Sequence, residues 1–366
     1  MIKIKTYSDI MSKQILEYIW LDNNQTVEGK QLRSKTKIID TDKPYDQFFG
    51  QDISRYPIWS FDGSSTNQAK TSESELYLKP VKAYKDPFRK NGGLLVLCEV
   101  CIMDDKGFLT PHVSNTRNLM VDTAKHLDDK EETWYGFEQE YIIMDPKASH
   151  PVGLNPTVKI QQGDYYCGVG HENVSVRNMV EEHMQLCLNI GLNLSGINAE
   201  VLKSQWEYQL GPVKAIEGCD DLWISRWVLK RLSENYGYKV VFDPKPIKGK
   251  DANGSGMHVN FSTLNMRNSN PAIKVSAIEL AISKLESKHK EHMLVYGNFN
   301  ECRLSGENET CDINTFKFGY GDRTASIRIP NSVKTYGPQG YIEDRRPASN
   351  GDPYMIVTKL LQTILG

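Results

Sequence analysis

The sequence predicts an α+β protein in which a strand-rich region precedes a larger region of alternating strands and helices. Three N-terminal segments carry the β-branched and aromatic residues that strands favour, and turn residues separate them. These segments are 17–22, 31–40 and 93–103. After the polar stretch 104–112, apolar residues recur with the period of helices, between short strand patterns. We therefore expect two domains, 18–105 and 112–366.

Helices are expected in the second domain wherever an apolar stripe has a capping residue at one end. They cover about 114–127, 177–190, 220–237 and 271–297. Gly191 and Gly237 each follow a helical pattern, and glycine readily adopts the left-handed backbone that ends a helix. The expected strands between and after the helices are 134–144, 206–212, 257–262 and 324–330. No further helix is expected after residue 297.

Composition excludes several functional classes. The 366 residues include 44 basic and 46 acidic side chains, so the formal net charge is −2. A binder of nucleic acid or of an anionic membrane needs a clustered excess of basic residues, which this balance argues against. No apolar run approaches the roughly 20 residues of a membrane helix, and the N-terminus lacks the pattern of a signal or transit peptide. We expect a soluble, cytoplasmic protein.

The seven cysteines are scattered along the chain. Cys98 and Cys101 form the one close pair, but they lie three residues apart in an expected strand and so point to opposite faces. We expect core thiols in a reducing compartment, without a metal-binding or redox role.

Two glutamates in the expected strand 134–144 are the first candidates for chemistry. Glu138 and Glu140 are two residues apart, so their carboxylates project from the same face. Two such charges are costly close together unless something positive lies beside them. An exposed strand edge with alternating glutamates is the alternative. The aromatic and aliphatic flanks favour a sequestered strand, and with it a metal or catalytic role.

More candidate ligands come from three later segments. Glu200 and Glu207 can reach one site only if the chain turns near Lys203–Ser204. His258 lies in an expected strand, where a lone histidine is usually structural, but the glycine-containing loop 253–256 before it lets the backbone approach a ligand closely. Glu343 shares a strand face with Tyr341 and Arg345 by the same parity.

The chemical type of these residues indicates the kind of site. Arg328 lies between isoleucines in an expected strand, a poor design for a solvent-facing position but a good one for an anion clamp. Carboxylates with one imidazole suit hard divalent cations, Mg²⁺ or Mn²⁺. His289 and His292 are discounted as ligands because they lie near the end of an expected helix, and no P-loop motif occurs. The residues alone therefore favour metal-dependent phosphoryl transfer, without identifying the acceptor.

Taken in order, a set of segments resembles glutamine synthetase, specifically the shorter eukaryotic-like type II enzymes. The segments are YIWLD (18–22), FDGSST (61–66), FEQEY (137–141), YYCGVG (165–170), NAEV (198–201), QWEYQLGP (205–212), FDPKPI (242–247), NGSGMHVNFS (253–262), RLSGENET (303–310), ASIRIP (325–330) and YIEDRRPASN (341–350). The resemblance implies an N-terminal β-grasp domain and a larger catalytic domain of the glutamine synthetase/guanido kinase type with an antiparallel sheet. It also implies a homo-oligomer, a decamer of two pentameric rings with active sites between subunits.

The family reaction is ATP-dependent ligation of ammonia to the side-chain carboxylate of L-glutamate through γ-glutamyl phosphate, which gives L-glutamine, ADP and phosphate. By resemblance, Glu138, His258 and Glu343 hold one metal ion, and Glu140, Glu200 and Glu207 hold another. The charge balance of carboxylates, substrates and arginines leads us to expect a third divalent ion on the ATP phosphates, so two or three Mg²⁺ or Mn²⁺ ions per site.

The resemblance also assigns the substrate contacts. Glutamate is expected to contact Asn253, Gly254, Arg303, Arg323 and Arg345. ATP is expected to contact Trp134, Glu207, Pro212, Asn260, Phe261, Ser262, Arg323, Arg328 and Tyr341. Ammonium is expected to contact Asp62, Ser65, Tyr166 and Glu309. The expected catalytic residues are Asp62, which deprotonates ammonium, Glu309, on a flap that closes over the intermediate, and Arg328.

Three positions depart from the family pattern. Asn308 stands where the flap usually has histidine, Cys302 replaces an arginine, and Ala252 replaces a tryptophan. None is an expected metal ligand. Two alternatives stay open: a ligase of the same scaffold that uses a bulkier amine, and a non-catalytic member whose ligands have decayed. Retention of the ammonium residues argues against the first, and retention of the metal ligands argues against the second.

Overall fold

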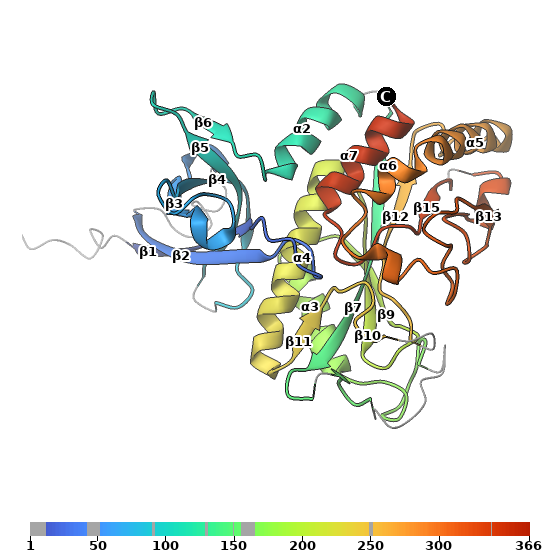
Figure 1. Ribbon diagram of the computed structural model, residues 1–366, viewed down its shortest axis with the longest axis horizontal. Helices are drawn as coiled ribbons and strands as arrows, with labels where there is room; N and C mark the ends of the chain where they lie inside the picture. Colours follow the sequence, from blue (N-terminus) through green and yellow to red (C-terminus); the bar gives the residue numbers. More distant parts are fainter. Residues whose placement is uncertain are drawn as a thin grey trace, which may run out of the picture. The chain divides into compact units, whose positions relative to one another are not determined.

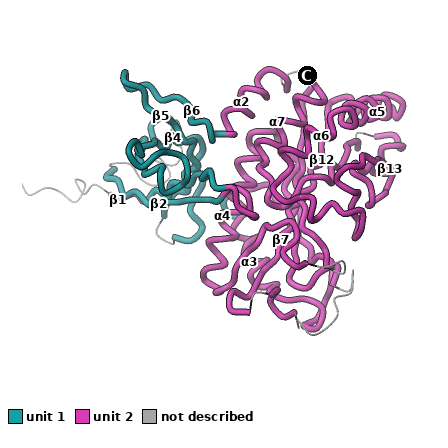
Figure 2. Tube along the Cα trace, in the orientation of Figure 1, with its two compact units in different colours: residues 1–24, 31–115, 189–191 teal, residues 25–30, 116–188, 192–366 magenta. Residues whose placement is uncertain are grey.

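The computed structural model describes residues 12–41, 52–89, 92–128, 131–148, 150–154, 165–248, 252–337 and 339–366. Contacts divide the chain into two compact units, coloured separately in Figure 2. Unit 1 comprises Met1–Asn24, Gln31–Asn115 and Asn189–Gly191, and unit 2 comprises Gln25–Lys30, Thr116–Leu188 and Leu192–Gly366. The chain thus passes from the first unit to the second after Asn115, just beyond the polar stretch 104–112.

Unit 1 is built on a six-stranded sheet of order β2-β1-β5-β4-β3, with β6 paired to β5. Its strands are β1 (Ser12–Leu21), β2 (Leu32–Thr41), β3 (Trp59–Asp62), β4 (Glu75–Lys85), β5 (Leu94–Met103) and β6 (Leu109–Pro111). The three strands expected from sequence are confirmed as β1, β2 and β5. The core of the unit includes Leu16 and Tyr18 of β1 and Leu94 and Val96 of β5, which pair in parallel. Two short 3₁₀ turns, Ile53–Arg55 and Gly63–Thr66, flank β3.

Unit 2 contains a nine-stranded sheet of order β13-β14-β15-β12-β7-β10-β9, with β8 and β11 also paired to β7. Its strands are β7 (Trp134–Asp145), β8 (His150–Pro151), β9 (Leu194–Ala199), β10 (Gln205–Val213), β11 (Lys239–Val241), β12 (Met257–Ser262), β13 (Phe318–Tyr320), β14 (Ile327–Ile329) and β15 (Ile342–Asp344). All of these pairings are antiparallel except β13 with β14. The expected antiparallel sheet is confirmed.

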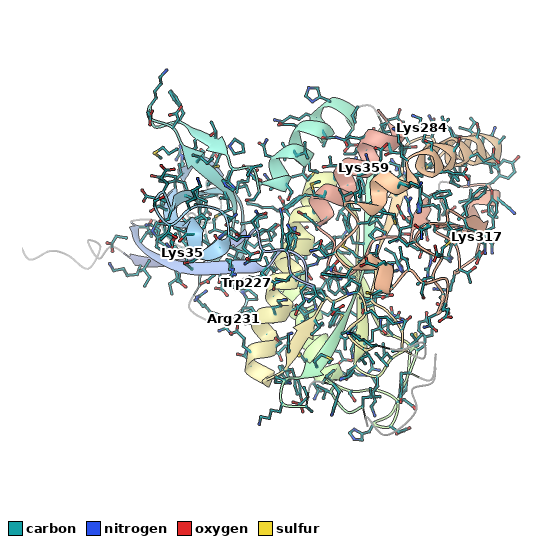
Figure 3. All side chains as sticks on the ribbon, in the orientation of Figure 1. Lys35, Trp227, Arg231, Lys284, Lys317 and Lys359 are labelled. Atoms are coloured by element: carbon teal, nitrogen blue, oxygen red, sulfur yellow. The ribbon has the colours of Figure 1, made fainter. Side chains whose placement is uncertain are left out.

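The helices of this unit are α2 (Thr116–Leu127), α3 (Arg177–Asn189), α4 (Ala215–Tyr236), α5 (Pro271–Ser287), α6 (His289–Met293) and α7 (Pro353–Ile364) (Figure 1). Helix α7 packs against α2, α4 and α5. The long helix α4 contacts β7, β10 and β11. Gly218 permits this close approach, since a Cβ there would lie 3.0 Å from Phe137 of β7. The apolar stripe of α4 is buried, including Trp227, which Figure 3 labels.

Because side chains alternate across a strand, packing of Phe137 against α4 turns its neighbour Glu138 to the opposite face. Phe137 and Tyr141 are both fully buried. The helix-covered face is thus apolar, and the other face of β7 is left to carry Glu138 and Glu140.

Several expected boundaries were wrong. Helix α4 begins at Ala215, five residues before the expected start at 220, because packing at Gly218 overrides the weak helical preference of glycine. The expected helix 271–297 is two helices, α5 and α6, interrupted at Lys288. The position of α6 is fixed by hydrogen bonds between His289 and Ile313 O and between His292 and Thr363 Oγ1. The strand expected over 324–330 is confined to Ile327–Ile329.

Helix α7 was not expected at all. Its start nevertheless has a sequence signal: Asp352 accepts a hydrogen bond from the Tyr354 N–H, and Pro353 occupies the first helical position. Within the residues that the structure describes, no helix combines the length and apolar character needed to span a bilayer.

Candidate active site

The sheet of unit 2 brings the predicted ligands together from strands far apart in sequence. Across β7 and β10, Glu140 pairs with Glu207. Across β7 and β12, Glu138 pairs with His258, and Glu343 follows on β15 beside β12. Glu200 comes directly after β9. The turn required between Glu200 and Glu207 is present, since Ser204 has a φ of 63° and the N–H of Glu200 bonds to Gln205 O at 2.9 Å.

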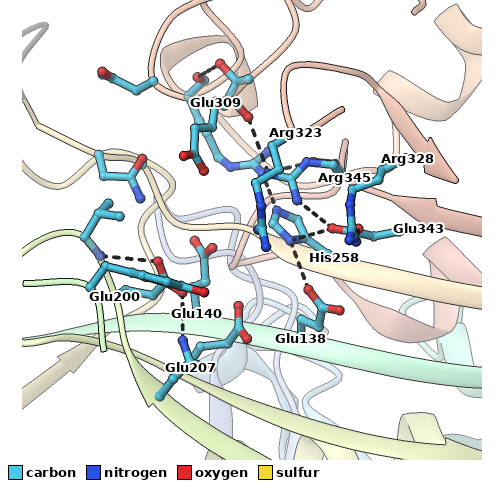
Figure 4. A pocket seen from close by; sticks show the side chains of 18 of the residues that line it. Glu138, Glu140, Glu200, Glu207, His258, Glu309, Arg323, Arg328, Glu343 and Arg345 are labelled. Atoms are coloured by element: carbon cyan, nitrogen blue, oxygen red, sulfur yellow. Dashed lines mark hydrogen bonds and ion pairs between the residues drawn. The ribbon is translucent and has the colours of Figure 1, made fainter. Parts of the chain in front are cut away.

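These side chains line a cavity of about 420 Å³ (Figure 4). All six predicted metal ligands are among its lining residues: Glu138, Glu140, Glu200, Glu207, His258 and Glu343. The cavity is also lined by Asn253, Gly254, Arg303, Arg323, Arg328 and Arg345, and by Tyr166, Asn308 and Glu309. Carboxylates, guanidinium groups and the loop 308–310 therefore face one space.

Charge pairing within the cavity is concentrated on Glu343. Arg328 Nη1 donates to Glu343 Oε2 at 2.5 Å, and Arg345 Nη1 donates to Oε1 at 2.6 Å. Glu343 is only 1% exposed, and the pair with Arg345 is shielded from water, whereas Arg328 is partly exposed. His258 Nδ1 lies 3.4 Å from Glu138 Oε2 and 3.5 Å from Glu343 Oε1.

Two groups of side chains place ligand atoms within 4.8 Å of one another. The first group, Glu138, His258 and Glu343, is the set predicted for one metal ion. The second contains Glu140 and Glu207, as predicted, but its third member is His258 where the sequence suggested Glu200. Glu200 lines the same cavity, and its role in the second set stays a prediction.

Burial disfavours the charged forms of these groups. Loss of hydration raises the pKa of Glu140 to about 6 and that of Glu200 to about 8, with repulsion from neighbouring carboxylates as a further cause. The same causes raise the pKa of Glu207 well above its ordinary value. Burial, and then the charge of Arg345, lower the pKa of His258, which keeps its imidazole neutral.

This donor set fits a divalent cation. Buried carboxylate oxygens that repel one another gain most from a cation between them, and a neutral imidazole nitrogen has a lone pair to offer. Oxygen ligands with one imidazole are typical of Mg²⁺ or Mn²⁺ sites and unlike the thiolate sets of structural zinc. All seven cysteines are free thiols; Cys98, Cys101, Cys187 and Cys219 are buried as expected of core thiols, whereas Cys167 and Cys302 are exposed and Cys311 is partly exposed.

A second cavity of about 810 Å³ adjoins the first, and Glu138 and Gln209 line both. Most residues predicted to contact nucleotide lie here: Trp134, Pro212, Asn260, Phe261, Ser262 and Tyr341. Glu207, Arg323 and Arg328 instead line the polar cavity. The apolar and aromatic lining suits a planar base, while the neighbouring charged cavity suits phosphates.

Arg267 is a lining residue of this second cavity that sequence reasoning missed. Its guanidinium carbon lies 4.1 Å from the centre of the Trp134 ring, and it donates to Ser262 O and Glu132 O. Nothing in the local sequence pattern distinguishes this arginine, because its partners come from other segments.

The predicted ammonium residues fall in different units. Asp62 caps the turn Gly63–Thr66 in unit 1, where its carboxylate accepts hydrogen bonds from Ser64 Oγ and Ser65 Oγ, each at 2.7 Å. These hydroxyl donors lower the pKa of Asp62 to about 2. Tyr166 belongs to unit 2 and lines the polar cavity. The roles of Asp62, Ser65 and Tyr166 stay predictions.

Fold and site together define an enzyme with a two-part cavity, one part suited to divalent cations and phosphates and the other to a base. The family model for the catalytic domain of glutamine synthetase matches residues 114–290, and the model for the glutamine synthetase beta-Grasp domain matches residues 12–102. The chain belongs to the glutamine synthetase family. Its unit 1 sheet is the expected β-grasp domain, and as a member of this family it is a glutamate–ammonia ligase.

Several relatives are similar over nearly their whole length. The chloroplastic glutamine synthetase of Chlamydomonas reinhardtii is 46% identical over 361 residues, which cover 95% of this chain and 90% of the relative. A glutamine synthetase of Debaryomyces hansenii is 45% identical and covers 97% and 90% of the two chains. The cytosolic isozyme 1-3 of Arabidopsis thaliana is 42% identical and covers 98% and 97%.

Proposed function

We propose that this chain ligates ammonia to the side-chain carboxylate of L-glutamate, with ATP as co-substrate and γ-glutamyl phosphate as intermediate. The observation that carries the proposal is the polar cavity itself, which gathers carboxylates, one imidazole and arginines from separate strands and adjoins an apolar cavity. A free carboxylate is unreactive toward an amine, so phosphorylation must come first. The substrate carboxylate oxygen bonds to the γ-phosphorus of ATP, and ADP leaves.

Side chains of the cavity have distinct parts in that first step. Arg345, Arg303 and the loop Asn253–Gly254 bind glutamate, and Arg323, which lines the same cavity, contacts both glutamate and ATP. Arg328 stabilises the charge on the phosphoryl group in transfer. Divalent cations held by the six ligands would neutralise phosphate charge, which is the chemistry that Mg²⁺ or Mn²⁺ supplies in such sites.

Asp62 takes a proton from ammonium, the resulting ammonia attacks the acyl carbon, and the departing phosphate accepts the proton that the attacking nitrogen loses. We assign capture of ammonium to Asp62, Ser65 and Tyr166, with Asp62 donated by a neighbouring subunit of a decamer. The low pKa of Asp62 suits a carboxylate that binds a cation. The flap that carries Glu309 closes over the acyl phosphate and excludes water, which protects this intermediate from hydrolysis.

Two of the three departures from the family pattern, Asn308 and Ala252, contact each other at this flap. Asn308 and Glu309 have φ values of 52° and 61°, and asparagine tolerates that region better than most residues. Asn308 Nδ2 donates to Ala252 O at 3.3 Å, which ties the flap to the loop that contains Asn253. We propose that two of the three departures act together, in holding the flap near the glutamate loop.

The test measures the two steps separately in the purified oligomer: phosphate release from ATP with glutamate, and glutamine formation with ammonia. Asp62→Ala should impair the use of ammonia far more than formation of the acyl phosphate. Asp52→Ala is the matched control, because Asp52 also caps a short 3₁₀ turn in unit 1 through a bond from the Ser54 N–H. Equal loss of both steps in Asp62→Ala would show that the assigned role is wrong.

Two further measurements separate the alternatives. Ammonia and polyamines assayed side by side decide whether a bulkier amine is the acceptor, and glutamate-dependent phosphate release separates an enzyme from a non-catalytic member. Mixing Asp62→Ala subunits with Glu207→Gln subunits tests the shared site. Recovery of activity on mixing is expected if one subunit supplies Asp62 to its neighbour. A cytoplasmic location is proposed by analogy with the relative from Arabidopsis thaliana, which is named a cytosolic isozyme.

A further inference from the structure

Two amide side chains connect the carboxylates on one side of the polar cavity. In the register of β9 and β10, Asn198 pairs with Glu207, and Glu207 pairs with Glu140 on the other side. Gln209 projects from the same face as Glu207, since the two are separated by one residue on β10. Asn198, Glu207 and Gln209 all line the cavity.

Hydrogen bonds join these groups in a chain. Gln209 Nε2 donates both to Glu207 Oε1 and to Asn198 Oδ1, the second bond at 2.7 Å. Asn198 Nδ2 in turn donates to Glu200 Oε1 at 2.9 Å. The chain thus runs from Glu207 through two amides to Glu200, and each carboxylate receives a donor at one end.

The polarity of this chain is fixed by its ends. In the ionised form that binds a cation, a carboxylate can only accept, so each amide turns its NH₂ group toward its carboxylate. Gln209 Nε2 donates to both Glu207 Oε1 and Asn198 Oδ1, so the Asn198 oxygen is the acceptor between the two amides. The arrangement accounts for the side-chain orientation of both residues.

The two halves of the cavity differ in how their carboxylates are supported. Glu343 forms ion pairs with Arg328 and Arg345, whereas no lysine or arginine in the described part of the chain forms an ion pair with Glu200 or Glu207. A guanidinium offsets part of the negative charge of a carboxylate. An amide orients the carboxylate and leaves its full negative charge available.

A glycine on β9 leaves space for the hydrogen-bonded amides. Gly196 pairs with Gln209 across β9 and β10, and a Cβ on Gly196 would lie 2.5 Å from Gln209 Oε1. Any larger residue at position 196 must push the Gln209 amide aside. A substitution here disturbs the amide without changing a residue of the cavity lining.

We infer that Asn198 and Gln209 are positioning residues that hold Glu200 and Glu207 together as one half of a divalent-cation site. The inference deepens the proposed function and rests on it. Neither amide is assigned a place on the metal ion. Both act through the carboxylates that they orient, as outer-sphere hydrogen bonds do at metal sites generally.

The test is a titration of the metal-free, nucleotide-free oligomer with Mn²⁺, in which free ion is followed by electron paramagnetic resonance. Gln209→Met and Asn198→Leu keep side-chain volume and remove the amide groups. Each should weaken Mn²⁺ binding about tenfold at one class of site and leave the other unchanged, in line with outer-sphere effects elsewhere. Gly196→Ala should shift binding in the same direction. Asn193→Ala is the control, since Asn193 also sits beside β9 but donates to Pro212 O.

Unchanged Mn²⁺ binding in Gln209→Met and Asn198→Leu would overturn the inference. Equal weakening of every site, with a lowered melting temperature, would also overturn it by showing a general structural role. The variant Glu207→Gln distinguishes failure of the positioning role from failure of the proposed function. If Glu207→Gln binds Mn²⁺ as the parent does, the carboxylate set is not a metal site. If it loses one class of site while Gln209→Met does not, only the positioning role fails.

Discussion

Replacement of Arg346 by methionine should destabilise the protein strongly, although Arg346 does not line the polar cavity. Arg346 forms a two-point ion pair with Asp344 through Nε to Oδ1 at 2.8 Å and Nη2 to Oδ2 at 2.7 Å. The exposed fractions of the two side chains are 1% and 0%. Asp344 also accepts a hydrogen bond from Tyr296 Oη at 2.7 Å. Without Arg346 the carboxylate stays buried and loses its charge partner.

Loss of one partner of a buried pair typically costs about 3–5 kcal/mol, and we expect Arg346→Met to fall in that range. The assay is equilibrium urea unfolding at one fixed protein concentration, because subunit association adds to apparent stability. Arg231→Met is the matched control. Arg231 pairs with Glu234 on the exposed surface of α4 (Figure 3), where an ion pair contributes about 1 kcal/mol or less.

A double substitution tests the reasoning further. Asp344→Leu combined with Arg346→Met removes both charges, so the double variant should be destabilised by clearly less than the sum of the two single variants. A coupling energy of about 2 kcal/mol or more is expected. Additive effects, or a loss below about 1 kcal/mol for Arg346→Met alone, would refute the view that this pair anchors the strand carrying Glu343.

Two other predictions concern the cavities. A carboxyl group with a raised folded-state pKa lowers the free energy of unfolding progressively as pH rises from its unfolded pKa to the raised one. The pKa of Glu140 is raised to about 6, so its effect lies below pH 6. Burial raises the pKa of Glu200 to about 8, so the metal-free protein should lose stability between pH 6 and pH 8. Mn²⁺ should therefore raise the melting temperature more at pH 8 than at pH 6, and an equal or smaller rise at pH 8 would count against this. Lys274 is fully buried and donates to the carbonyls of Thr335, Gly337 and Gln339, the last of which lines the second cavity, where we propose that ATP binds. Lys274→Met should raise KM for ATP several-fold with little change in KM for glutamate. Steady-state kinetics with each substrate varied in turn measures both constants. A rise in KM for glutamate with an unchanged KM for ATP would contradict the prediction.

Much of the site could be predicted because strand parity is a local property. The alternation that places Glu138 and Glu140 on one face, and the need for a turn between Glu200 and Glu207, follow from residue spacing alone. The turn at Ser204 and the shared cavity confirm both.

Other features depend on which strands become neighbours, and spacing cannot reveal that. The pairing of Asn198 with Glu207 depends on the register between β9 and β10, so the sequence could not predict the hydrogen bonds that link Glu207, Gln209, Asn198 and Glu200. Arg267 lines the second cavity because it contacts distant segments, donating to Ser262 O and Glu132 O. The start of α4 was misplaced because tertiary packing at Gly218 decides it. Helix α7 was missed although Asp352 and Pro353 mark its start locally.

The most direct measurement is anomalous scattering from crystals of the protein with Mn²⁺ and a non-hydrolysable ATP analogue. We expect one Mn²⁺ among Glu138, His258 and Glu343, a second among Glu140, Glu200 and Glu207, and a third on the phosphates. Only two peaks would contradict the third ion. A polar cavity without Mn²⁺, or Glu200 and Glu343 directed away from the ions, would contradict the proposal that these strands assemble a metal-dependent phosphoryl-transfer site.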